Sequence, residues 1–377
     1  MRVPKIAYLA NSEHVGGGNR SLLSMVQKVK EKGHEILIFV PAEGDFTSLL
    51  KAKNFQYKVV NHRLGQFSKS AFFLRLLQYI KALKSFSPDI LHANDLYCYF
   101  IASFVAKILK VPIICHIRFS VEEESVKHYM RILPEVIIFN SYYMKNLFLN
   151  KNPDFSCSVR NEVVYNFFDP SEYYCPQQRE ILRERWRVGD CFLVGMIGNF
   201  SPQKGHDTYL YMAKKLLKSS CDFRFVIVGK DLDPSKKNEE RIKKLIKSLS
   251  IEDYIIWLGY QKDVGKILSA LDVLVVPSIY EPFGRVAVEG LLAGLPVVAS
   301  RTGGLIEILE DAPYGFLVDR NNYNEFANIV RNIKNKKLSF PLVDNRNYAI
   351  SRFGIEANLK LLMKLYDSLI GYGFFFV

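Results

Sequence analysis

The six cysteines of this 377-residue sequence are scattered, and no two of them are separated by only two residues. This spacing argues against a zinc ribbon and a thioredoxin-like site, and it favours reduced thiols. Long hydrophobic runs are missing as well. Nowhere do about 18 apolar residues follow one another without a charge, so we expect no segment that spans a bilayer. The basic N-terminus has too short an apolar run for a signal peptide, and we therefore expect a cytoplasmic protein.

Acidic residues are absent between positions 46 and 88, where eight Lys and Arg occur. In the later part of this segment, apolar residues such as Phe72, Phe73 and Leu77 are interleaved with Arg75 and the lysines. A basic amphipathic helix of this kind can lie on an anionic lipid surface. It can equally be a core helix with a solvated basic face. Both interpretations stay open, and the first predicts peripheral contact with an anionic membrane.

Length and composition are those of a folded protein with two domains, at roughly 150 residues per domain. Apolar residues make up 49% and charged residues 24%, which excludes a disordered, collagen-like or coiled-coil chain. The 51 Lys and Arg exceed the 38 Asp and Glu and give a formal charge of +13. This excess predicts an anionic partner, and charge alone does not choose among nucleic acid, a membrane face and phosphate-bearing substrates.

Short apolar runs alternate with segments of helical period, which is the pattern of parallel sheets covered by crossover helices. In the first half, a helix at 20–29 follows a loop at 11–18, and we expect strands at 6–10, 36–40, 90–93, 113–117 and 136–140. The polar segment 172–187 is interpreted as a linker. The alternation then restarts, with strands at 192–197, 223–228, 255–258, 273–277, 297–299 and 316–318, and helices at 206–218, 239–248 and 356–370. The fold class is therefore α/β with two doubly wound domains, whose ligand is expected in the cleft between the carboxyl ends of their strands.

The most informative stretch joins the expected strand at 273–277 to a helix that begins near Arg285. Free N–H groups at this helix start form an anion site, and Gly284 lets a phosphate approach the backbone. Glu281 lies in the loop and Glu289 in the second helical turn. A carboxylate repels phosphate, so both are better suited to accept hydrogen bonds from hydroxyls. An arbitrary pair of glutamates is more often structural, but phosphate beside two hydroxyl-binding carboxylates describes a nucleotide sugar.

The residues of this stretch are Glu-Pro-Phe-Gly at 281–284, Glu289, Ala-Gly-Leu-Pro at 293–296 and Gly-Gly at 303–304. The sequence resembles the retaining glycosyltransferases of family four, whose signature is two glutamates separated by seven residues. The resemblance implies the GT-B fold, a nucleotide-sugar donor, and no metal or other cofactor. It also implies that Glu281 contacts hydroxyls of the donor sugar and Glu289 the ribose. Phe283, Gly284 and Arg285 would hold the diphosphate.

The resemblance extends over nearly the whole chain. Lys204 and Gly205 match the loop that holds the diphosphate in the family, whereas Asn199 stands where the family usually has Arg. Arg118 occupies the position, six residues after a proline, that is commonly His, and His116 lies two residues earlier. Alternate strand residues share a face, so we expect at least one of the two to contact sugar or phosphate. Taken alone, His116 is more often a hydrogen-bonded core histidine.

Gly-Gly-Gly-Asn-Arg at 16–20 is similar to the family's N-terminal glycine loop, which lies against the donor diphosphate and the acceptor. Phe167 replaces a glycine that usually precedes the crossover between domains. The resemblance implies an acceptor-binding Rossmann-like domain at 1–174, a donor-binding one at 175–355, and a helix at 356–377 that crosses back to the first domain. Catalytic roles are expected for Glu281, Lys204, Arg118 and His116, and donor binding for Gly17, Gly18, Arg20, Asn199, Lys204, Phe283, Gly284, Arg285 and Glu289.

The predicted function is retaining transfer of a hexose from a nucleotide sugar to a glycan or lipid-linked acceptor, in surface polysaccharide biosynthesis, without nucleic acid as a partner. Other classes stay open on the residues alone. Gly16 and Gly18 after a strand, with Glu43 after the next, form part of a nicotinamide-binding fingerprint, although Ser21 stands where Gly or Ala is required. A non-catalytic protein that binds an anionic surface would also explain the charge. A GT-B epimerase or phosphorylase would share the fold and differ in its products.

Overall fold

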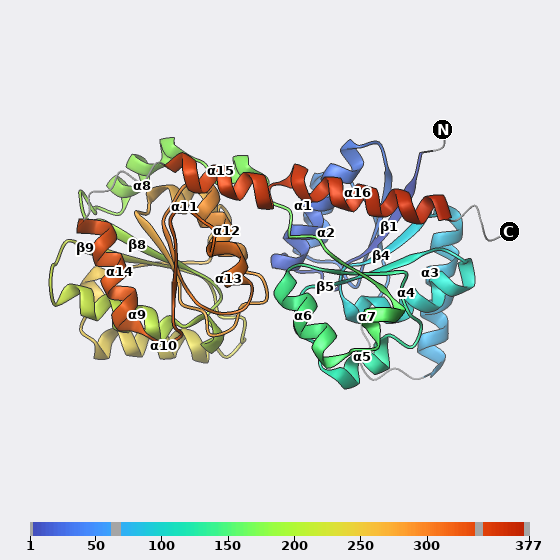
Figure 1. Cartoon of the computed structure of the whole chain (residues 1–377), viewed down its shortest axis with the longest axis horizontal. Helices are drawn as coiled ribbons and strands as arrows, with labels where there is room; N and C mark the ends of the chain where they lie inside the picture. Colours follow the sequence, from blue (N-terminus) through green and yellow to red (C-terminus); the bar gives the residue numbers. More distant parts are fainter. Residues whose placement is uncertain (1–2, 62–68, 336–341, 373–377) are drawn as a thin grey trace. The chain divides into compact units, whose positions relative to one another are not determined.

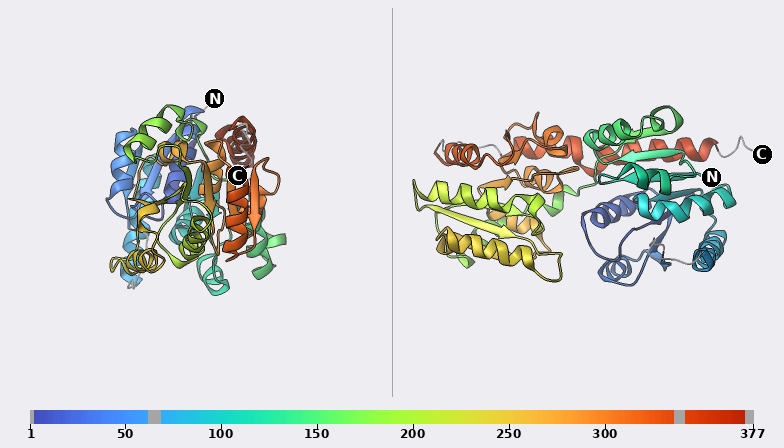
Figure 2. Two further views of the ribbon diagram at one scale, coloured as in Figure 1. Left: turned by 90° about the vertical axis from the view of Figure 1, so that its left-hand side faces the viewer. Right: turned by 90° about the horizontal axis from the view of Figure 1, so that it is seen from below.

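The computed structural model of the chain describes residues 3–61, 69–335 and 342–372 (Figure 1). These residues form two compact units. The first contains the chain up to Phe168 together with helix α16 (Ile355–Tyr372), and the second contains Asp169–Gly354. Each unit is a parallel sheet with helices on its two faces (Figures 1 and 2). The expected α/β class with two doubly wound domains is confirmed.

The sheet of the first unit has seven strands in the order β3-β2-β1-β4-β5-β6-β7. They are β1 (Lys5–Leu9), β2 (Glu35–Val40), β3 (Gln56–Val59), β4 (Ile90–Ala93), β5 (Ile113–Ile117), β6 (Val136–Phe139) and β7 (Arg160–Val163). The two edge strands, β3 and β7, were not expected. β3 is largely exposed and β7 is half-buried, and they carry polar residues such as Lys58 and Glu162 in place of an apolar run. Charged side chains are common on edge strands, where they discourage pairing with another chain.

Two cores cover the two faces of this sheet, because successive residues of a strand point to opposite faces. Leu37 and Phe39 of β2 belong to one core, and Ile36 and Ile38 belong to the other. The first core includes α3 and α4, and the second includes α1 and α16. The helices of this unit besides α16 are α1 (Gly17–Glu31), α2 (Asp45–Ala52), α3 (Lys69–Phe86), α4 (Leu96–Leu109), α5 (Glu123–Tyr129), α6 (Tyr142–Lys151) and α7 (Phe155–Ser158).

The sheet of the second unit has six strands in the order β10-β9-β8-β11-β12-β13. They are β8 (Phe192–Ile197), β9 (Phe223–Val228), β10 (Ile255–Gly259), β11 (Val273–Val276), β12 (Val297–Ser300) and β13 (Gly315–Val318). The helices are α8 (Arg179–Arg185), α9 (His206–Leu217), α10 (Lys237–Ser248), α11 (Val264–Ala270), α12 (Arg285–Leu292), α13 (Gly304–Leu309), α14 (Tyr323–Asn335) and α15 (Leu342–Phe353). The strand order changes direction between β8 and β11, which is where open α/β sheets bind ligands.

The segment expected to be a linker is partly helical and belongs to the second unit. Helix α8 lies within it, and Nη1 of its Arg183 lies 3.2 Å from the carboxylate of Asp272. The second unit begins at Asp169, before the expected boundary at 174/175. The reason is local packing. Arg346 donates from Nη1 to the Pro170 carbonyl at 3.1 Å, and its guanidinium lies 4.5 Å from the centre of the Tyr174 ring.

Helix α16 packs on α1 in the first unit. Within the described part of the chain, no helix is long and apolar enough to cross a membrane.

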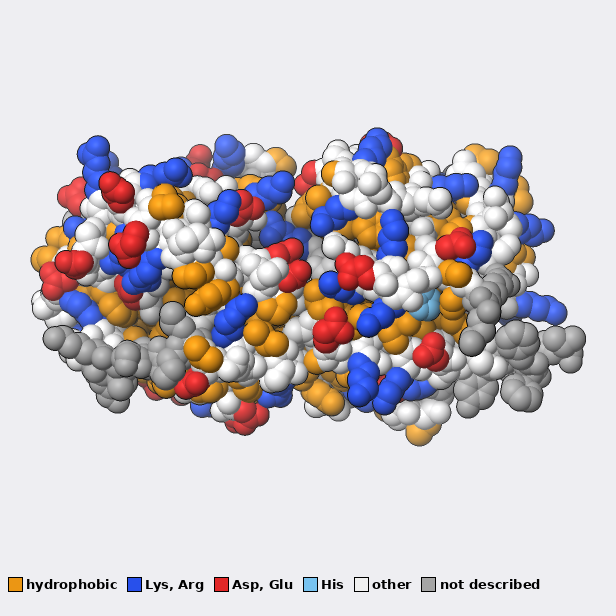
Figure 3. Space-filling model, turned by 90° about the horizontal axis from the view of Figure 1, so that it is seen from above, with side chains coloured by type: hydrophobic (Ala, Val, Ile, Leu, Met, Phe, Trp, Pro, Cys, Tyr) orange, Lys and Arg blue, Asp and Glu red, His pale blue; other side chains and the backbone are white. Residues whose placement is uncertain are grey.

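On the face shown in Figure 3, Lys and Arg side chains are spread over both units with Asp and Glu among them. The net charge of +13 is therefore not gathered in a single patch on that face.

Candidate active site

The predicted catalytic residues of the second unit meet at the carboxyl edge of its sheet. Lys204 ends a single 3-10 turn (Pro202–Lys204) after β8, and Glu281 follows β11. Nζ of Lys204 lies 2.6 Å from Oε2 of Glu281. The hydroxyl of Ser278 donates to the same carboxylate oxygen at 3.3 Å. The cation predicted for phosphate and the carboxylate predicted for sugar hydroxyls are therefore one ion pair, partly open to solvent.

Glycines allow the loops at this edge to approach one another. Gly205 has a left-handed φ of +73°, and a β-carbon there would lie 1.9 Å from the carbonyl oxygen of Pro277. A β-carbon at Gly229 would lie 1.9 Å from the carbonyl oxygen of Gly198. The N–H of Ile279 donates to the Gln203 carbonyl at 2.8 Å and ties the two loops together. Because Gly205 has no side chain, the loop that carries Lys204 lies directly against the end of β11.

Helix α12 begins at Arg285, directly after Gly284. The helix dipole makes this end attractive to an anion. The N–H of Gly304 donates to the Glu281 carbonyl at 3.0 Å and supports the loop from α13. The Phe283 ring is buried beside Phe353, with ring centres 6.0 Å apart. Phe283 therefore anchors the loop with its side chain, and only its backbone remains for a ligand.

Glu289 is more enclosed than its position in the second turn of α12 suggests. It is 5% exposed. One of its oxygens lies 3.4 Å from Nη2 of Arg285, one turn earlier, and 3.4 Å from the hydroxyl of Tyr173. Arg285 thus orients this carboxylate in addition to standing at the helix start. Asn199, by contrast, is exposed at the end of β8.

Lys230 and Tyr260 lie at the same edge without any motif that would predict them. They follow β9 and β10, and Nζ of Lys230 lies 4.8 Å from the centre of the Tyr260 ring. The ring is 51% exposed. The strand order β10-β9-β8 places Tyr260 two strands from the end of β8, which is about 10 Å at the usual strand spacing. The only signal in the sequence is that each residue closely follows an expected strand.

Arg118 is the centre of the predicted site in the first unit. It follows β5 and is 9% exposed. Its Nε donates to Oδ1 of Asn94 at 2.9 Å, and its Nη1 donates to Oδ1 of Asn166 at 2.7 Å. A β-carbon added at Gly18 would lie 3.7 Å from its side chain. Arg118 is thus held in one position beside the glycine loop by two neutral amides, which follow β4 and β7.

His116 belongs to a chain of buried polar groups behind Arg118. Its Nδ1 lies 3.2 Å from Nη2 of Arg118 and 3.4 Å from Nε2 of His92. Nδ1 of His92 lies 2.7 Å from the Tyr366 hydroxyl, which lies 2.9 Å from that of Tyr8. Burial, and then the charge of Arg118, lower the pKa of both histidines, that of His92 to about 3. Both rings are therefore neutral.

The tautomer of His116 follows from these contacts. A guanidinium only donates, so Nδ1 of His116 accepts from Arg118 and the single proton of the neutral ring is on Nε2. His116 is fully buried and contacts Arg118. We therefore regard it as a residue that positions Arg118. The alternation of strand residues placed the two on one face, as expected.

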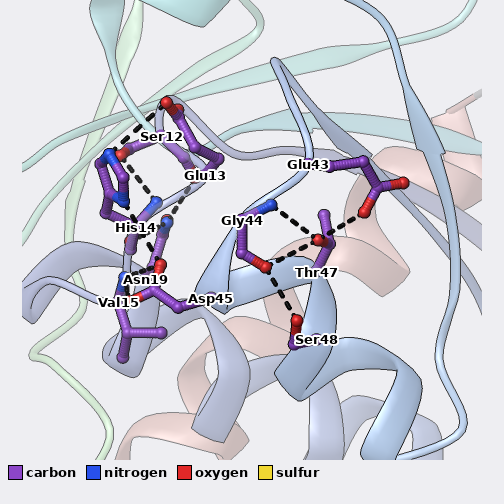
Figure 4. Close-up of polar contacts among 10 residues, drawn as sticks. All are labelled: Ser12, Glu13, His14, Val15, Asn19, Glu43, Gly44, Asp45, Thr47 and Ser48. Atoms are coloured by element: carbon purple, nitrogen blue, oxygen red, sulfur yellow. Dashed lines mark hydrogen bonds and ion pairs between the residues drawn. The ribbon is translucent and has the colours of Figure 1, made fainter.

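The glycine loop between β1 and α1 is braced from both sides (Figure 4). Nδ2 of Asn19 donates to the carbonyls of Ser12 and His14 at 2.7 and 2.8 Å. The N–H of Val15 donates to the Asp45 carboxylate at 3.2 Å, and Asp45 is the first residue of α2. These contacts give the loop a fixed shape without using its glycines.

Among the predicted donor-binding residues of this loop, Gly17 is exposed and Arg20 is half-buried on α1. Glu43, the acidic residue of the nicotinamide alternative, accepts a hydrogen bond from the Thr47 hydroxyl at 2.7 Å (Figure 4). The structure brings together Gly18, His116 and Arg118 in the first unit. In the second unit it pairs Lys204 with Glu281, and Arg285 with Glu289, and the segment from Glu281 to Glu289 includes Phe283 and Gly284. In the described ranges, no three His, Cys, Asp or Glu residues are grouped to hold a metal ion.

Two families account for almost the whole chain. Residues 15–172 match the family described as Glycosyltransferase Family 4, and residues 178–353 match the family described as Glycosyl transferases group 1. Each match coincides closely with one parallel-sheet unit. The chain therefore belongs to the glycosyltransferases with the GT-B fold, with a family 4 domain followed by a group 1 domain.

Proteins with similar sequences also have names that describe glycosyltransferases. An uncharacterized glycosyltransferase of Methanocaldococcus jannaschii, MJ1178, is 33% identical over 236 residues, which cover 62% of this chain and 59% of that protein. The UDP-Gal:alpha-D-GlcNAc-diphosphoundecaprenol alpha-1,3-galactosyltransferase of Escherichia coli is 24% identical over 315 residues. That match covers 78% of this chain and 79% of the relative.

Solved structures show the same fold. Anabaena HepE in complex with UDP and glucose superimposes with a TM-score of 0.85 at 23% identity, covering 97% of this chain and all of that one. WaaG, a glycosyltransferase involved in lipopolysaccharide biosynthesis, gives a TM-score of 0.72 at 18% identity, covering 97% of this chain and 99% of that one. At these identities the likeness establishes the architecture alone.

Proposed function

We propose that this chain transfers a hexose from a nucleotide-sugar donor to a glycan or lipid-linked acceptor, with retention at the anomeric carbon, during surface polysaccharide synthesis. The observation that carries the proposal is the Lys204–Glu281 ion pair next to the start of α12. This pair places a cation suited to phosphate and a carboxylate suited to sugar hydroxyls beside the positive end of a helix dipole. The names of the E. coli relative and of the HepE complex support a uridine diphosphate donor.

Each residue has a distinct role in this proposal. Lys204 and the first N–H groups of α12 bind the diphosphate and stabilise the negative charge that develops on it. Glu281 accepts hydrogen bonds from the donor sugar, and Glu289 from the ribose. The exposed face of Tyr260 offers a surface on which a base can stack. Arg118, fixed by its amide partners, contacts phosphate or sugar.

In the proposed reaction, the bond from the anomeric carbon to the diphosphate oxygen breaks. The bond from that carbon to the acceptor oxygen forms on the same face of the sugar. The acceptor proton passes to the leaving phosphate oxygen, so the protein needs no separate base. Lys204 and the helix N–H groups stabilise the leaving group, and we propose that no metal or other cofactor takes part.

The site of action that we propose is the cytoplasmic face of a membrane, reached by peripheral contact. A lipid-linked acceptor would be presented there, and the name of the E. coli relative includes a diphosphoundecaprenol acceptor. The charge of +13 and the segment without acidic residues favour an anionic surface.

Donor binding tests the proposal. A panel of uridine- and guanosine-linked sugars should include one that protects the purified protein against thermal unfolding. Glu289→Ala should weaken binding of that sugar about 10- to 100-fold, the worth of hydrogen bonds to a charged group. Glu240→Ala, which removes an exposed glutamate of α10, should leave binding unchanged.

Turnover decides the reaction type. With an acceptor present, the protein should release nucleoside diphosphate and form a product that keeps the anomeric configuration of the donor. Full activity after the loss of both Glu281 and Glu289 would contradict the assigned site. Inversion at the anomeric carbon would contradict the retaining reaction. Binding of NADH, without binding of any nucleotide sugar, would favour an oxidoreductase instead.

A further inference from the structure

A cavity lies at the carboxyl edge of the second sheet, on the side of the candidate site away from Tyr260. Its volume is about 580 Å³, and it is lined by Ile279, Arg301, Asp319, Arg320 and Asn321. These residues follow β11, β12 and β13, the three strands at one end of the sheet. Sites for small molecules commonly have volumes of about 300–1,000 Å³. The cavity is therefore large enough for a sugar residue.

Two arginines give this cavity the means to bind an anion. Arg301 follows β12, and Arg320 lies two residues after the end of β13. The N–H of Arg301 donates to the Val318 carbonyl at 2.6 Å and ties the ends of these strands together. Both side chains are exposed, and within the ranges that the structure describes neither guanidinium has a hydrogen-bond or ion-pair partner. A guanidinium binds a carboxylate or phosphate through two parallel N–H donors, so the pair favours an anionic ligand.

The remaining polar side chains of the cavity suit sugar hydroxyls. Asp319 stands opposite Arg301, because Ser300 pairs with Val318 in the register of β12 and β13. Among the described side chains, however, no ion pair joins the two. The carboxylate of Asp319 is thus available to accept hydrogen bonds, and the amide of Asn321 can both accept and donate them.

Two exposed tyrosine rings lie next to the cavity. Tyr323 comes two residues after Asn321, and Tyr211 lies one turn of α9 after Thr208, whose hydroxyl is 3.5 Å from Oδ1 of Asn321. The two rings are 37% and 42% exposed, and their centres are 5.5 Å apart. The C–H face of a sugar ring is apolar and packs on such rings, which are large, rigid and apolar on their faces. Guanidiniums, a carboxylate and aromatic rings together describe a site for an acidic saccharide.

The order of the strands places the cavity beyond the sugar end of the proposed donor. Tyr260 follows β10, Lys204 follows β8 and Glu281 follows β11, whereas the cavity extends from β11 to β13. With the base on Tyr260 and the diphosphate at Lys204, the donor sugar lies at Glu281. Ile279 precedes Glu281 by two residues, and its carbonyl accepts from the Thr302 hydroxyl at 3.2 Å. The cavity therefore begins directly beside the sugar-binding carboxylate.

We propose that this cavity binds an acidic sugar residue of the acceptor, one that bears a carboxylate or a phosphate. Arg301 and Arg320 bind the anionic group, Asp319 and Asn321 bind hydroxyls, and Tyr323 packs on a sugar ring. This inference rests on the proposed transferase function and adds the chemical class of the acceptor. A free sugar phosphate offers the same chemistry as an acidic residue within a glycan.

Calorimetric titration of the full chain with two matched disaccharides tests the proposal. Cellobiouronic acid carries a glucuronic acid residue where cellobiose carries glucose. The protein is first saturated with UDP, which occupies the diphosphate site and keeps a carboxylate from binding at Lys204. Cellobiouronic acid should bind about tenfold or more tightly than cellobiose, the worth of hydrogen bonds between charged groups.

Variants of exposed residues assign this difference to the cavity. Arg301→Gln with Arg320→Gln should remove the preference for cellobiouronic acid and leave UDP binding unchanged. Tyr323→Ser should weaken binding of both disaccharides about fivefold and keep their ratio. The matched control is Arg185→Gln with Arg187→Gln, which removes two exposed arginines at the end of α8 and should change neither value. Thermal unfolding of both arginine variants should match that of the parent, because the replaced side chains are exposed.

The inference is overturned if the two disaccharides bind equally, or if the Arg301 and Arg320 variant keeps the preference. Tighter binding of glucose 6-phosphate than of cellobiouronic acid would also overturn it, in favour of a free sugar phosphate as the ligand. Binding of UDP separates these outcomes from failure of the proposed function. UDP binding without a preference for the acidic disaccharide would contradict the acceptor site alone. The preference without any binding of UDP would contradict the transferase.

Discussion

At the scale of single residues, the ion pair between Lys204 and Glu281 has the largest consequence for the site. The two side chains are 2.6 Å apart, and the Glu281 carboxylate also accepts from Ser278. Each charge therefore fixes the position of the other. A phosphate that binds Lys204 also changes the surroundings of the carboxylate predicted to hold the sugar, so the two contacts with the donor are coupled.

Coupling of this kind predicts that mutations at the two positions are not additive. Lys204→Ala and Glu281→Ala should each lower kcat/KM, and the double variant should differ from the sum by about 0.5–3 kcal/mol. The measurement is kcat/KM for the four proteins of the cycle. Strictly additive losses would show that the two groups act separately.

The control cycle uses Glu239 and Lys243 on α10, which form an ion pair of the same length, 2.6 Å, on the surface. Removing either or both of these side chains should leave kcat/KM unchanged. Any loss of activity in this cycle would mean that the assay responds to stability and not to the site.

The residues of the site could be predicted where their spacing within one short segment indicates their role. The spacing of Glu281 and Glu289, and the shared face of His116 and Arg118, are properties of short segments. The partners of Arg118 were not predictable, because Asn94 and Asn166 follow β4 and β7 and meet it only through the order of strands in the sheet. The contact of Tyr173 with Glu289 was not predictable either, because the two residues are 116 positions apart in the sequence.

At the scale of elements, the turn at Gly205 determines where the Lys204 loop lies. A β-carbon at this position would be 1.9 Å from the Pro277 carbonyl oxygen, and φ is +73°. The backbone of one loop therefore rests directly on the end of β11. Any side chain at position 205 must push the two apart.

Gly205→Ala is expected to destabilise the second unit by a few kcal/mol, from the strained φ and the clash with backbone. It should also move Lys204 and weaken donor binding. Gly189→Ala is the matched control, because Gly189 also has a positive φ, +50°, but nothing lies within 4 Å of an added β-carbon. Urea unfolding of both variants measures the difference, and equal losses would show that the close approach is not what requires glycine.

Central strands were predictable as elements because both of their faces are buried and their residues are apolar throughout. The edge strands β3 and β7 were not, since one side of each is solvated and their sequences read as polar loops. Helix α8 was mistaken for part of a linker because its charged residues include Arg179 and Arg183. In the structure both of these arginines bind Asp272.

At the scale of the whole molecule, buried histidines link stability to pH. Burial lowers the pKa of His92 to about 3, that of His206 to about 4 and that of His116 well below its usual value. In the unfolded chain a histidine takes up a proton near pH 6.5. Between these values the unfolded state binds more protons, so the free energy of unfolding falls as pH decreases. Burial raises the pKa of Asp95 to about 6, so this one group has the opposite effect and stabilises the folded state as pH decreases.

The protein is therefore expected to be less stable at about pH 5 than at about pH 7, as measured by urea midpoints. His206→Gln should reduce this difference, because it removes one of the groups that must stay neutral in the folded state. Equal midpoints at the two pH values would contradict the expected linkage.

The architecture as a whole was predictable because the alternation of strands and helices recurs along the chain. The boundary between the two units was harder to predict. The expected boundary lay at 174/175, whereas the second unit begins at Asp169, where Arg346 binds the Pro170 carbonyl and packs on the Tyr174 ring.

The contact between Tyr366 and Tyr8 has a consequence for synthesis of the protein. Leu359, Leu362 and Tyr366 belong to the same core as β1, yet a ribosome makes them after every residue of the second unit. Part of the apolar surface of the first unit therefore stays uncovered until α16 has been made, after the whole of the second unit. The second unit is complete before the first, and a nascent chain halted near residue 354 would hold one finished unit and one that lacks its last helix.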